Sequence, residues 1–268
     1  METDKQAVHD FWNASSCGET LYLKGSEGTA YTTQASKRYE LEPYIERFAD
    51  FAAARGHEVL EIGVGLGADH QRFAEAGALL TGVDLTERAV AHTSQRLAAF
   101  GLRSHLHTAD AEDLPFAEAS FDVVYSWGVL HHSPNTPKAI DEVWRVLRPG
   151  GSARIMVYHT YSMVGYMLWI RYALLAGRPS RSLADIYAQH LESPGTKAYT
   201  VDEARRLFAR FSKVTIETVL THGDLLISEA GQRHRGPLLT IAKALWPRWL
   251  IRTLLPRHGL FLLARATK

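Results

Sequence analysis

Between residues 56 and 158 the chain alternates short apolar runs with stretches in which apolar positions recur at helical spacing. The apolar runs predict five strands, at residues 57–62, 78–83, 104–108, 121–126 and 152–158. The stretches between them predict helices at residues 69–76, 87–100 and 137–147. Thr86 fits an N-cap, and Gly77 and Gly101 fit helix ends. Strands that alternate with helices predict an α/β fold with a parallel, doubly wound sheet covered on both faces.

The alternation stops after residue 158. Residues 163–176 are strongly apolar and aromatic and predict a helix, and residues 202–211 predict a short amphipathic helix. Runs at 213–220 and 260–266 predict an antiparallel hairpin at the sheet edge. The segment 221–259 between these two strands is far longer than an ordinary hairpin loop. Upstream of the alternating region, residues 35–54 predict a helix.

These elements predict one domain over residues 1–268. We expect an N-terminal helical cap (1–55), a ligand-binding core (56–158), a lid or substrate insertion (159–200), and a sheet edge (201–268) that contains the insertion 221–259. The hydrophobic share of 46% and the charged share of 22% are typical of soluble globular proteins. A lone cysteine, Cys17, favours a reducing compartment, so we expect a cytoplasmic location.

Three glycines, Gly63, Gly65 and Gly67, follow the first predicted strand at alternate positions. Glycine allows a ligand to approach the backbone closely because no Cβ stands in the way. The spacing differs from the Gly-x-Gly-x-x-Gly pattern of dinucleotide-binding loops. The loop alone therefore indicates either a ligand site or a tight turn.

Acidic residues stand at the ends of the first three strands. Glu61 precedes the glycine loop and can anchor backbone amides or, through water, an ammonium group. Asp84 follows the second strand, where a carboxylate can accept hydrogen bonds from both hydroxyls of a ribose, although a solvated loop acid would look the same. Asp110 follows the third strand, where an acid beside a small residue can bind an adenine amino group. The carboxyl ends of parallel strands meet at one edge, so these acids are expected to converge there.

Five segments carry a resemblance to a known family: VLEIGVGLG (59–67), TGVDL (81–85), TADAEDLPF (108–116), SFDVVYSWGVLHH (120–132) and VWRVLRPGG (143–151). Their order and spacing resemble the class I S-adenosylmethionine-dependent methyltransferases, in the group that includes ubiquinone-biosynthesis and sterol-type enzymes. The resemblance covers residues 31–158. It implies a Rossmann-like sheet of seven strands in the order 3-2-1-4-5-7-6, with strand 7 antiparallel and S-adenosylmethionine bound over the strand ends.

The resemblance also implies, position by position, which residues bind the cofactor. The methionine part of the cofactor is expected to lie against Glu61, Gly63 and Gly65, and the ribose against Asp84 and Leu85. The adenine is expected between Asp110, Ala111 and Glu112. Ser126 and Trp127 are expected near the amino-acid or sulfonium end. Related enzymes place an aromatic lid and an arginine before the first strand, and Tyr31 and Arg38 occupy these positions. Arg38 fits a surface residue of the helix equally well.

Methyl transfer depends mainly on the alignment of donor and acceptor, and a general base is needed only when the acceptor carries a proton. His131 and His132 follow the fourth predicted strand, and Tyr158 closes the fifth. These three are the candidate catalytic residues, with simple packing as the alternative. Cys17 fits a packed thiol better than a nucleophile. The sequence has no His-Glu-x-x-His or paired Cys-x-x-Cys spacing, so no metal site is expected.

Three segments outside the core are candidates for acceptor specificity: residues 11–22, 158–199 and 221–259. The run at 192–199 either closes over the acceptor or is a structural connection. The last segment mixes apolar, aromatic and basic residues. It either packs on the core with its charges solvated or contacts an anionic membrane through residues 233–257.

These features favour methyl transfer to a small, rather apolar or aromatic acceptor, such as a natural product or a lipid-like intermediate. The alternatives are methylation of a protein or nucleic acid, and a non-catalytic module that binds S-adenosylmethionine. A formal net charge of +1 and the absence of a long basic stripe argue against a nucleic-acid partner. No pattern in the sequence indicates an oligomeric state.

Overall fold

The computed structural model describes residues 2–25, 27–228 and 243–268. Seven strands form one sheet in the order β3-β2-β1-β4-β5-β7-β6. The strands are β1 (Glu58–Ile62), β2 (Leu79–Asp84), β3 (His105–Thr108), β4 (Phe121–Trp127), β5 (Leu147–Tyr158), β6 (Lys213–Val219) and β7 (Phe261–Thr267). β7 runs antiparallel to β5 and β6, and the remaining neighbours are parallel. The predicted strand order and the antiparallel seventh strand are confirmed.

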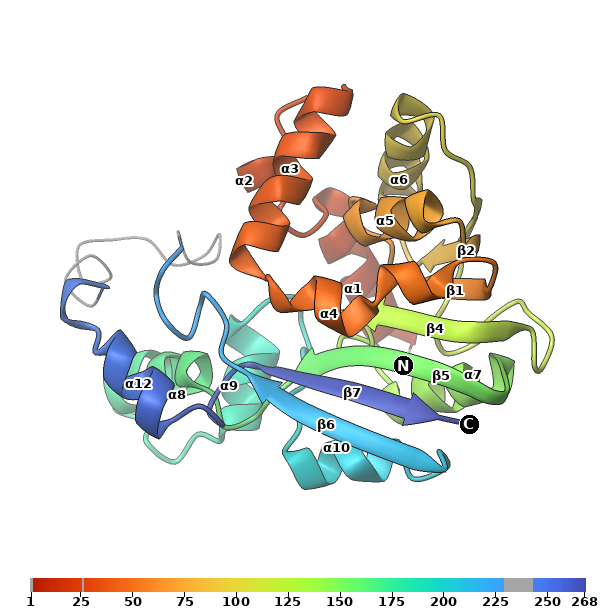
Figure 1. Ribbon diagram of the computed structural model, residues 1–268. Coiled ribbons are helices and arrows are strands. Elements are labelled where there is room, and N and C mark those ends of the chain that lie inside the picture. The colour runs from red at the N-terminus through yellow and green to blue at the C-terminus, as the bar shows by residue number, and fades with distance from the viewer. Residues whose placement is uncertain (1, 26, 229–242) are drawn as a thin grey trace.

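Helices cover both faces of this sheet (Figure 1). The N-terminal helices are α1 (Glu2–Ala14), α2 (Glu19–Tyr22), α3 (Gly28–Leu41), α4 (Tyr44–Ala49) and the 3-10 helix η1 (Phe51–Ala54). Within and after the alternating region come α5 (Ala68–Ala76), α6 (Glu87–Ala99), α7 (Thr136–Val146), α8 (Met163–Trp169), the π-helical turn η2 (Ile170–Leu174), α9 (Leu183–His190), α10 (Val201–Leu207) and α12 (Arg248–Leu254). α4, η1 and α5 pack on one face, and α7 and α10 on the other.

The strands are apolar on both sides because each side faces a separate core. Along β4, Val124 belongs to the core under α7 and α10, and Phe121 reaches the same core because the strand register shifts between residues 121 and 123. Val123 and Tyr125 belong to the core under α4 and α5. Successive side chains of a strand point to opposite faces, so a strand covered on both sides reads as a nearly continuous apolar run.

The predicted helix 35–54 is wrong as one element, because the structure divides it among α3, α4 and η1. Pro43 follows α3 and disfavours helical backbone at Glu42, which adopts φ −127°. Asp50 then adopts φ 48° and ends α4. The predicted helix 163–176 is likewise shorter, because α8 passes into η2 and a turn. The Thr86 cap is confirmed, since its side chain accepts a hydrogen bond from Ala89 N.

The connection from β6 to β7 is anchored at its base by one buried carboxylate. Asp224 Oδ2 accepts hydrogen bonds from Thr221 N and Leu260 N, both at 2.8 Å, and Oδ1 accepts one from Val164 N at 3.1 Å. Asp224 therefore ties this connection to β7 and to α8. Part of the predicted insertion and of the candidate membrane segment, residues 229–242, lies outside the described residues. In the part of the chain that is described, no helix combines the length and apolarity needed to cross a bilayer.

Candidate functional site

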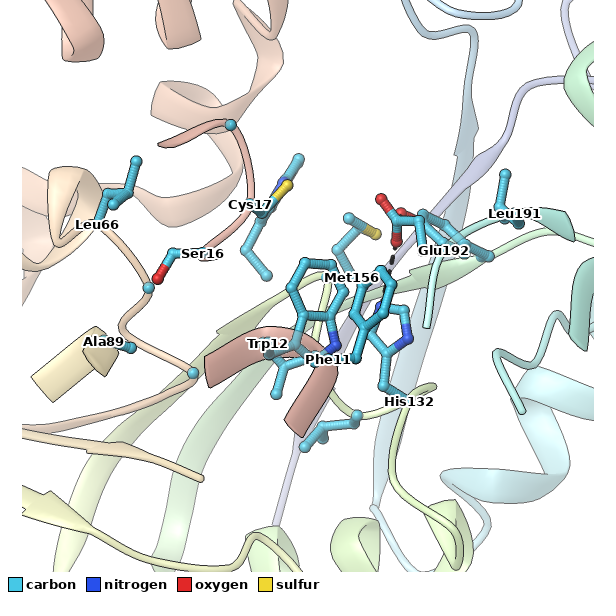
Figure 2. Close-up of a pocket in the computed structure, with 18 of the residues that line it drawn as sticks. Phe11, Trp12, Ser16, Cys17, Leu66, Ala89, His132, Met156, Leu191 and Glu192 are labelled. Atoms are coloured by element: carbon cyan, nitrogen blue, oxygen red, sulfur yellow. Dashed lines mark hydrogen bonds and ion pairs between the residues drawn. The ribbon is translucent and has the colours of Figure 1, made fainter. Parts of the chain in front are cut away.

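A cavity of about 1220 Å³ lies at the carboxyl ends of the central strands (Figure 2). Pockets for a single small ligand usually measure about 300–1,000 Å³, so this cavity has room for a nucleotide-sized cofactor and a second molecule. One end is formed by the glycine loop, Asp84 and Asp110. The other end is formed by aromatic and aliphatic side chains around His132, Tyr158 and Glu192.

The glycine loop fits a ligand that lies against its backbone. Gly65 has φ +52°, and a Cβ added there would meet no protein atom within 4 Å. Because Gly65 lines the cavity, that Cβ would project into empty space where a ligand can lie. Gly63 has a different requirement: a Cβ there would come within 2.0 Å of the Val129 side chain. One glycine thus leaves room for a ligand, and the other allows close packing of the loop behind it.

The predicted ribose residue, Asp84, is held in place by the loops around it. Its Oδ2 accepts a hydrogen bond from Gly65 N at 3.2 Å, and its Oδ1 accepts from Thr86 N and Thr86 Oγ1 at 3.0 and 2.9 Å. Burial raises the pKa of this carboxyl above its ordinary value. Leu85 lines the cavity beside it. Oδ2 accepts one of these three hydrogen bonds, so it keeps capacity for one hydroxyl donor.

Helix α1 closes the end of the cavity where the adenine is expected. Lys5 Nζ donates a hydrogen bond to Asp110 and lies 3.1 Å from Glu112 Oε2. Asp110 and Ala111 line the cavity, as expected, but Glu112 is buried behind its wall. Glu112 accepts hydrogen bonds from Ser133 Oγ and from the backbone of residue 135, and so fixes the loop that carries the two histidines.

Arg38 reaches the cavity but is paired within the protein. Its Nε and Nη2 donate to the two carboxylate oxygens of Asp69 at 3.1 and 2.7 Å. Although Asp69 is buried, Arg38 holds the pKa of its carboxyl below the ordinary value. Glu42 Oε2 lies 3.4 Å from Arg38 Nη1, and burial raises the pKa of Glu42 to about 7. Any anion that Arg38 binds must therefore share it with these two acids.

Besides Glu112, two other predicted cofactor contacts lie outside the cavity lining. The ring of Tyr31 is fully buried under the guanidinium of Arg96, at 5.0 Å. Ser126 is buried and donates a hydrogen bond to Ile62 O at 2.9 Å. The aromatic cover expected from Tyr31 comes instead from Phe11 and Trp12 of α1 and from Tyr22 of α2. Trp127 lines the cavity as expected and stacks on Tyr44 at 5.9 Å.

Glu61 lies at the start of a buried proton chain. Glu61 Oε2 is 2.8 Å from His70 Nδ1, and His70 Nε2 is 2.7 Å from Ser104 Oγ. Ser104 donates its one hydroxyl proton to Leu80 O at 2.9 Å, so it accepts from His70 Nε2–H. Burial lowers the pKa of His70 to about 3 and raises that of Glu61 well above its ordinary value. The neutral histidine therefore accepts a proton at Nδ1, and Glu61 supplies it as a carboxylic acid.

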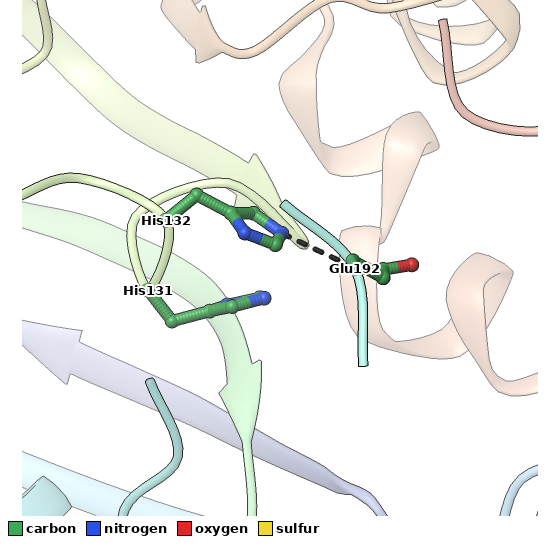
Figure 3. A group of neighbouring side chains, drawn as sticks. All are labelled: His131, His132 and Glu192. Carbon is green, nitrogen blue, oxygen red and sulfur yellow. Dashed lines mark ion pairs between the residues drawn. The ribbon is translucent and has the colours of Figure 1, made fainter. Parts of the chain in front are cut away.

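His132 is the histidine of the pair that faces the cavity (Figure 3). Its Nδ1 lies 2.8 Å from Ser193 Oγ and 3.1 Å from Thr196 Oγ1. Thr196 donates its hydroxyl proton to Ser193 O, so its oxygen can only accept from His132. This assigns a proton to Nδ1, so in the neutral ring it is Nε2 that carries the lone pair.

Glu192 stands next to that lone pair. Glu192 Oε2 lies 3.3 Å from His132 Nε2 (Figure 3), and Tyr158 donates its hydroxyl proton to the same oxygen at 2.7 Å. The residue comes from the 192–199 run, which is fixed beneath the histidines by Lys197 N donating to His131 O at 3.0 Å. This run thus contributes to the cavity and also anchors the histidine loop.

His131 is fully buried and does not line the cavity. Neither of its ring nitrogens has a hydrogen-bond partner among the described residues. Burial lowers the pKa of His131 well below its ordinary value, so its ring is neutral. Its ring lies 4.0 Å from that of Tyr158.

His131, His132 and Glu192 each place one potential ligand atom within 4.8 Å of the ligand atoms of the other two. Two histidines and a carboxylate are a composition that metal ions can use. Here Glu192 already accepts the proton of Tyr158, and His132 is bound to Ser193. These hydrogen bonds favour a group of residues that transfers a proton over a metal site.

Cys17 lines the acceptor end of the cavity (Figure 2). The Cys17 side chain is exposed to solvent, and partial desolvation within the cavity, followed by the nearby carboxylates of Glu192 and Glu42, raises the pKa of its thiol above the ordinary value. The side chain is thus a neutral thiol that contributes to the cavity wall.

Comparisons with known proteins agree with this geometry. Residues 60–155 match the methyltransferase domain family. A 27-O-demethylrifamycin SV methyltransferase of Amycolatopsis mediterranei is 39% identical over 99 residues, which are 36% of this chain and 36% of that protein. A ubiquinone biosynthesis O-methyltransferase of Aromatoleum aromaticum is 33% identical over 125 residues, which are 45% of this chain and 52% of that protein. The chain spans about a third of the length of the first curated relatives that it matches.

The fold is shared with solved structures across almost the whole chain. Haemonchus contortus phosphoethanolamine N-methyltransferase 2, solved with phosphomonomethylethanolamine and S-adenosylhomocysteine, gives a TM-score of 0.60 at 17% identity. That match covers 97% of this chain and 60% of the other. Residues 60–155 thus match a methyltransferase domain, and the likeness to solved structures extends the same fold, with its strand order, over the rest of the chain.

Proposed function

We propose that this protein transfers a methyl group from S-adenosylmethionine to a small, largely apolar or aromatic acceptor through a protonated nucleophile, such as a hydroxyl group. The observation that carries this proposal is the His132–Glu192–Tyr158 group at the apolar end of the cavity. The glycine loop, Asp84 and Asp110 form the cofactor half of the same cavity.

The cofactor supplies an electrophilic methyl group, and the residues of the chain orient the reactants and handle one proton. Ser193 and Thr196 hold the Nδ1–H tautomer, so His132 Nε2 can accept the acceptor's proton. The resulting imidazolium would lie 3.3 Å from the Glu192 carboxylate, which stabilises the new positive charge. Tyr158 keeps that carboxylate in position.

The walls of the acceptor half support an apolar acceptor. Side chains that line it include Trp12, Trp127, Met156, Leu168 and Phe261. A pocket with apolar walls and a few convergent polar groups favours a ligand with one polar reacting group on an apolar body. The two relatives named above carry the names of small-molecule methyltransferases, which supports the same class of acceptor.

The test is to incubate the protein with methyl-tritiated S-adenosylmethionine and a bacterial lysate, and then to separate lipid-soluble, protein and nucleic-acid fractions. We expect label in the lipid-soluble fraction. His132→Gln should reduce it about 10²–10⁴-fold, because a general base contributes about that factor. S-adenosylhomocysteine binding should be unchanged in this variant. His105→Gln, a change at an exposed position on β3, is the matched control.

Label confined to protein or nucleic acid would overturn the proposed acceptor class. Equal transfer by wild type and His132→Gln would overturn the role of His132. Transfer that is lost with a chelator and restored by a metal ion would replace the proton-transfer interpretation with a metal site.

A further inference from the structure

Two segments at the acceptor end of the molecule carry cations and no acids. Residues 161–182 contain Arg171, Arg178 and Arg181, and residues 243–258 contain Lys243, Arg248, Arg252 and Arg257; neither contains Asp or Glu. The formal charge of the whole chain is only +1, so the rest of the molecule is net negative. Positive charge is therefore concentrated in these two segments.

The same segments expose most of the large apolar side chains at the surface. Among the described residues ten large hydrophobic side chains are exposed, and eight of them belong to these segments: Tyr161, Ile170, Leu174, Leu175, Leu245, Trp249, Leu250 and Leu254. In α12 only Ile251 is buried, whereas Trp249 is 76% exposed and Leu254 is 66% exposed. A helix packed on the core with only its charges in water would bury these side chains.

The two segments lie side by side (Figure 1). Met163 N donates a hydrogen bond to His258 O at 2.9 Å, and Tyr166 Oη lies 2.8 Å from His258 Nδ1. The two segments therefore adjoin, and we call their exposed side chains together the basic apolar face (residues 161–182 and 243–258). Exposed apolar side chains gathered in one region of a surface mark an interaction site.

The basic apolar face is continuous with the cavity. Met167, Ile170, Arg171 and Leu175 from the first segment and Trp246 from the second line the cavity wall. The acceptor half of the cavity therefore adjoins the basic apolar face. If another surface is docked on this face, a molecule can pass from that surface into the cavity without crossing bulk water.

We propose that the basic apolar face docks on an anionic lipid bilayer. Exposed Trp and Leu side chains fit the boundary between headgroups and acyl chains, and the surrounding cations attract anionic headgroups. A second copy bound symmetrically through this face would bring the same cations against each other, because a two-fold interface pairs one patch with itself. Docking is independent of catalysis, but entry of a membrane-dissolved acceptor rests on the proposed function.

The experiment is flotation of the full chain with vesicles of phosphatidylcholine alone or with 30% phosphatidylglycerol. We expect flotation with the anionic vesicles, retention at the bottom with the neutral ones, and weaker flotation at high salt. Trp249→Ser/Leu254→Ser and Arg178→Glu/Arg252→Glu should each lower vesicle binding at least tenfold. Matched controls are Leu79→Ser, which is 55% exposed on β2, and Arg47→Glu/Arg205→Glu on α4 and α10.

S-adenosylhomocysteine binding reports whether each variant is folded, because none of the substituted residues lines the cavity. Wild-type protein that binds S-adenosylhomocysteine and stays at the bottom with anionic vesicles would overturn the docking proposal and leave the proposed function intact. A concentration-dependent dimer that Trp249→Ser/Leu254→Ser abolishes would assign the face to a second copy. Equal binding to neutral and anionic vesicles would overturn the role of the cations.

Discussion

Glu42 shows how a buried acid in the cavity wall couples stability to pH. Burial raises its pKa to about 7, compared with about 4.5 for the free side chain. The folded protein therefore keeps this proton at a pH where the unfolded chain has lost it. Its contribution to stability is complete below about pH 4.5 and is lost as the pH rises to about 7.

Glu42→Gln should remove this pH dependence. The free energy of unfolding of the variant, relative to wild type, should rise between pH 4.5 and 7.5 by up to roughly 3 kcal/mol, at about 1.4 kcal/mol for each pKa unit. Urea unfolding at a series of pH values measures this difference. Glu40→Gln, at an exposed position on α3 two residues before Glu42, is the control and should give a flat difference. A flat difference for Glu42→Gln as well would contradict the assignment.

At the residue scale, the sequence predicted the cofactor side of the cavity better than the acceptor side. Gly65, Asp84 and Asp110 follow strands that neighbour one another in a parallel sheet, so their positions follow from the strand order. Ser193 and Lys5 gain their roles from contacts with His132 and Asp110, which lie 61 and 105 residues away. No local pattern predicts contacts at such separations.

At the scale of single elements, α1 covers the cofactor end. Lys5 binds Asp110, Asn13 Oδ1 accepts a hydrogen bond from Arg88 N at 3.2 Å, and Trp12 packs against His132 at 5.2 Å. α1 is also held by Lys5 with Glu112 and by His9 with Glu87, at 3.1 and 3.2 Å. None of these polar partners belongs to a strand, so the helix can open without unfolding the sheet. We expect its opening to limit release of the product.

Lys5→Ala should therefore speed the dissociation of S-adenosylhomocysteine, by about three- to tenfold in a stopped-flow displacement experiment. Stability should change by less than about 1 kcal/mol, because a partly exposed ion pair contributes little. Lys24→Ala, at an exposed position beyond α2, is the control. An unchanged dissociation rate would show that α1 does not gate the site.

Element boundaries were predicted well where capping is local and poorly where tertiary contacts decide. The helix after Thr86 begins as predicted because the threonine side chain itself caps it. Pro43 was present in the sequence, yet the helical pattern on both sides of it predicted one helix. The backbone at Glu42 and Asp50 shows that the proline and the packing of α4 on the sheet prevail.

For the whole molecule, ligand binding at the junction of several elements should stabilise the entire fold. S-adenosylhomocysteine at a hundred times its Kd should add about 2.7 kcal/mol to the free energy of unfolding. For a chain of this size that corresponds to a rise in Tm of about 5–10 °C. The Asp84→Ala variant should need a ligand concentration at least roughly tenfold higher than wild type for the same rise in Tm, because the expected contact with the ribose is lost.

Thermal unfolding with S-adenosylhomocysteine and, separately, with NAD measures this effect. Asp113→Ala, at an exposed position near the adenine end, is the control and should behave as wild type. A rise in Tm with NAD that equals the rise with S-adenosylhomocysteine would contradict the cofactor assignment.

The topology was predictable because strand and helix periodicities alternate and because the glycine loop marks the first strand. The arrangement of the basic apolar face could not be predicted. Its two segments are separated by about 60 residues in the sequence and meet through tertiary contacts such as that of Met163 with His258.

The position of β7 has a consequence for folding. Within the sheet, β6 pairs only with β7, and β7 also covers the edge of β5. During synthesis β6 is complete about 40 residues before its one partner exists, and those intervening residues include α12 with its exposed Trp249. Until residues 261–267 insert, β5 and β6 are unpaired edges beside an apolar helix, which is the state most open to aggregation. Substitutions that slow this late insertion should lower the yield of soluble protein more than they lower the stability of the finished fold.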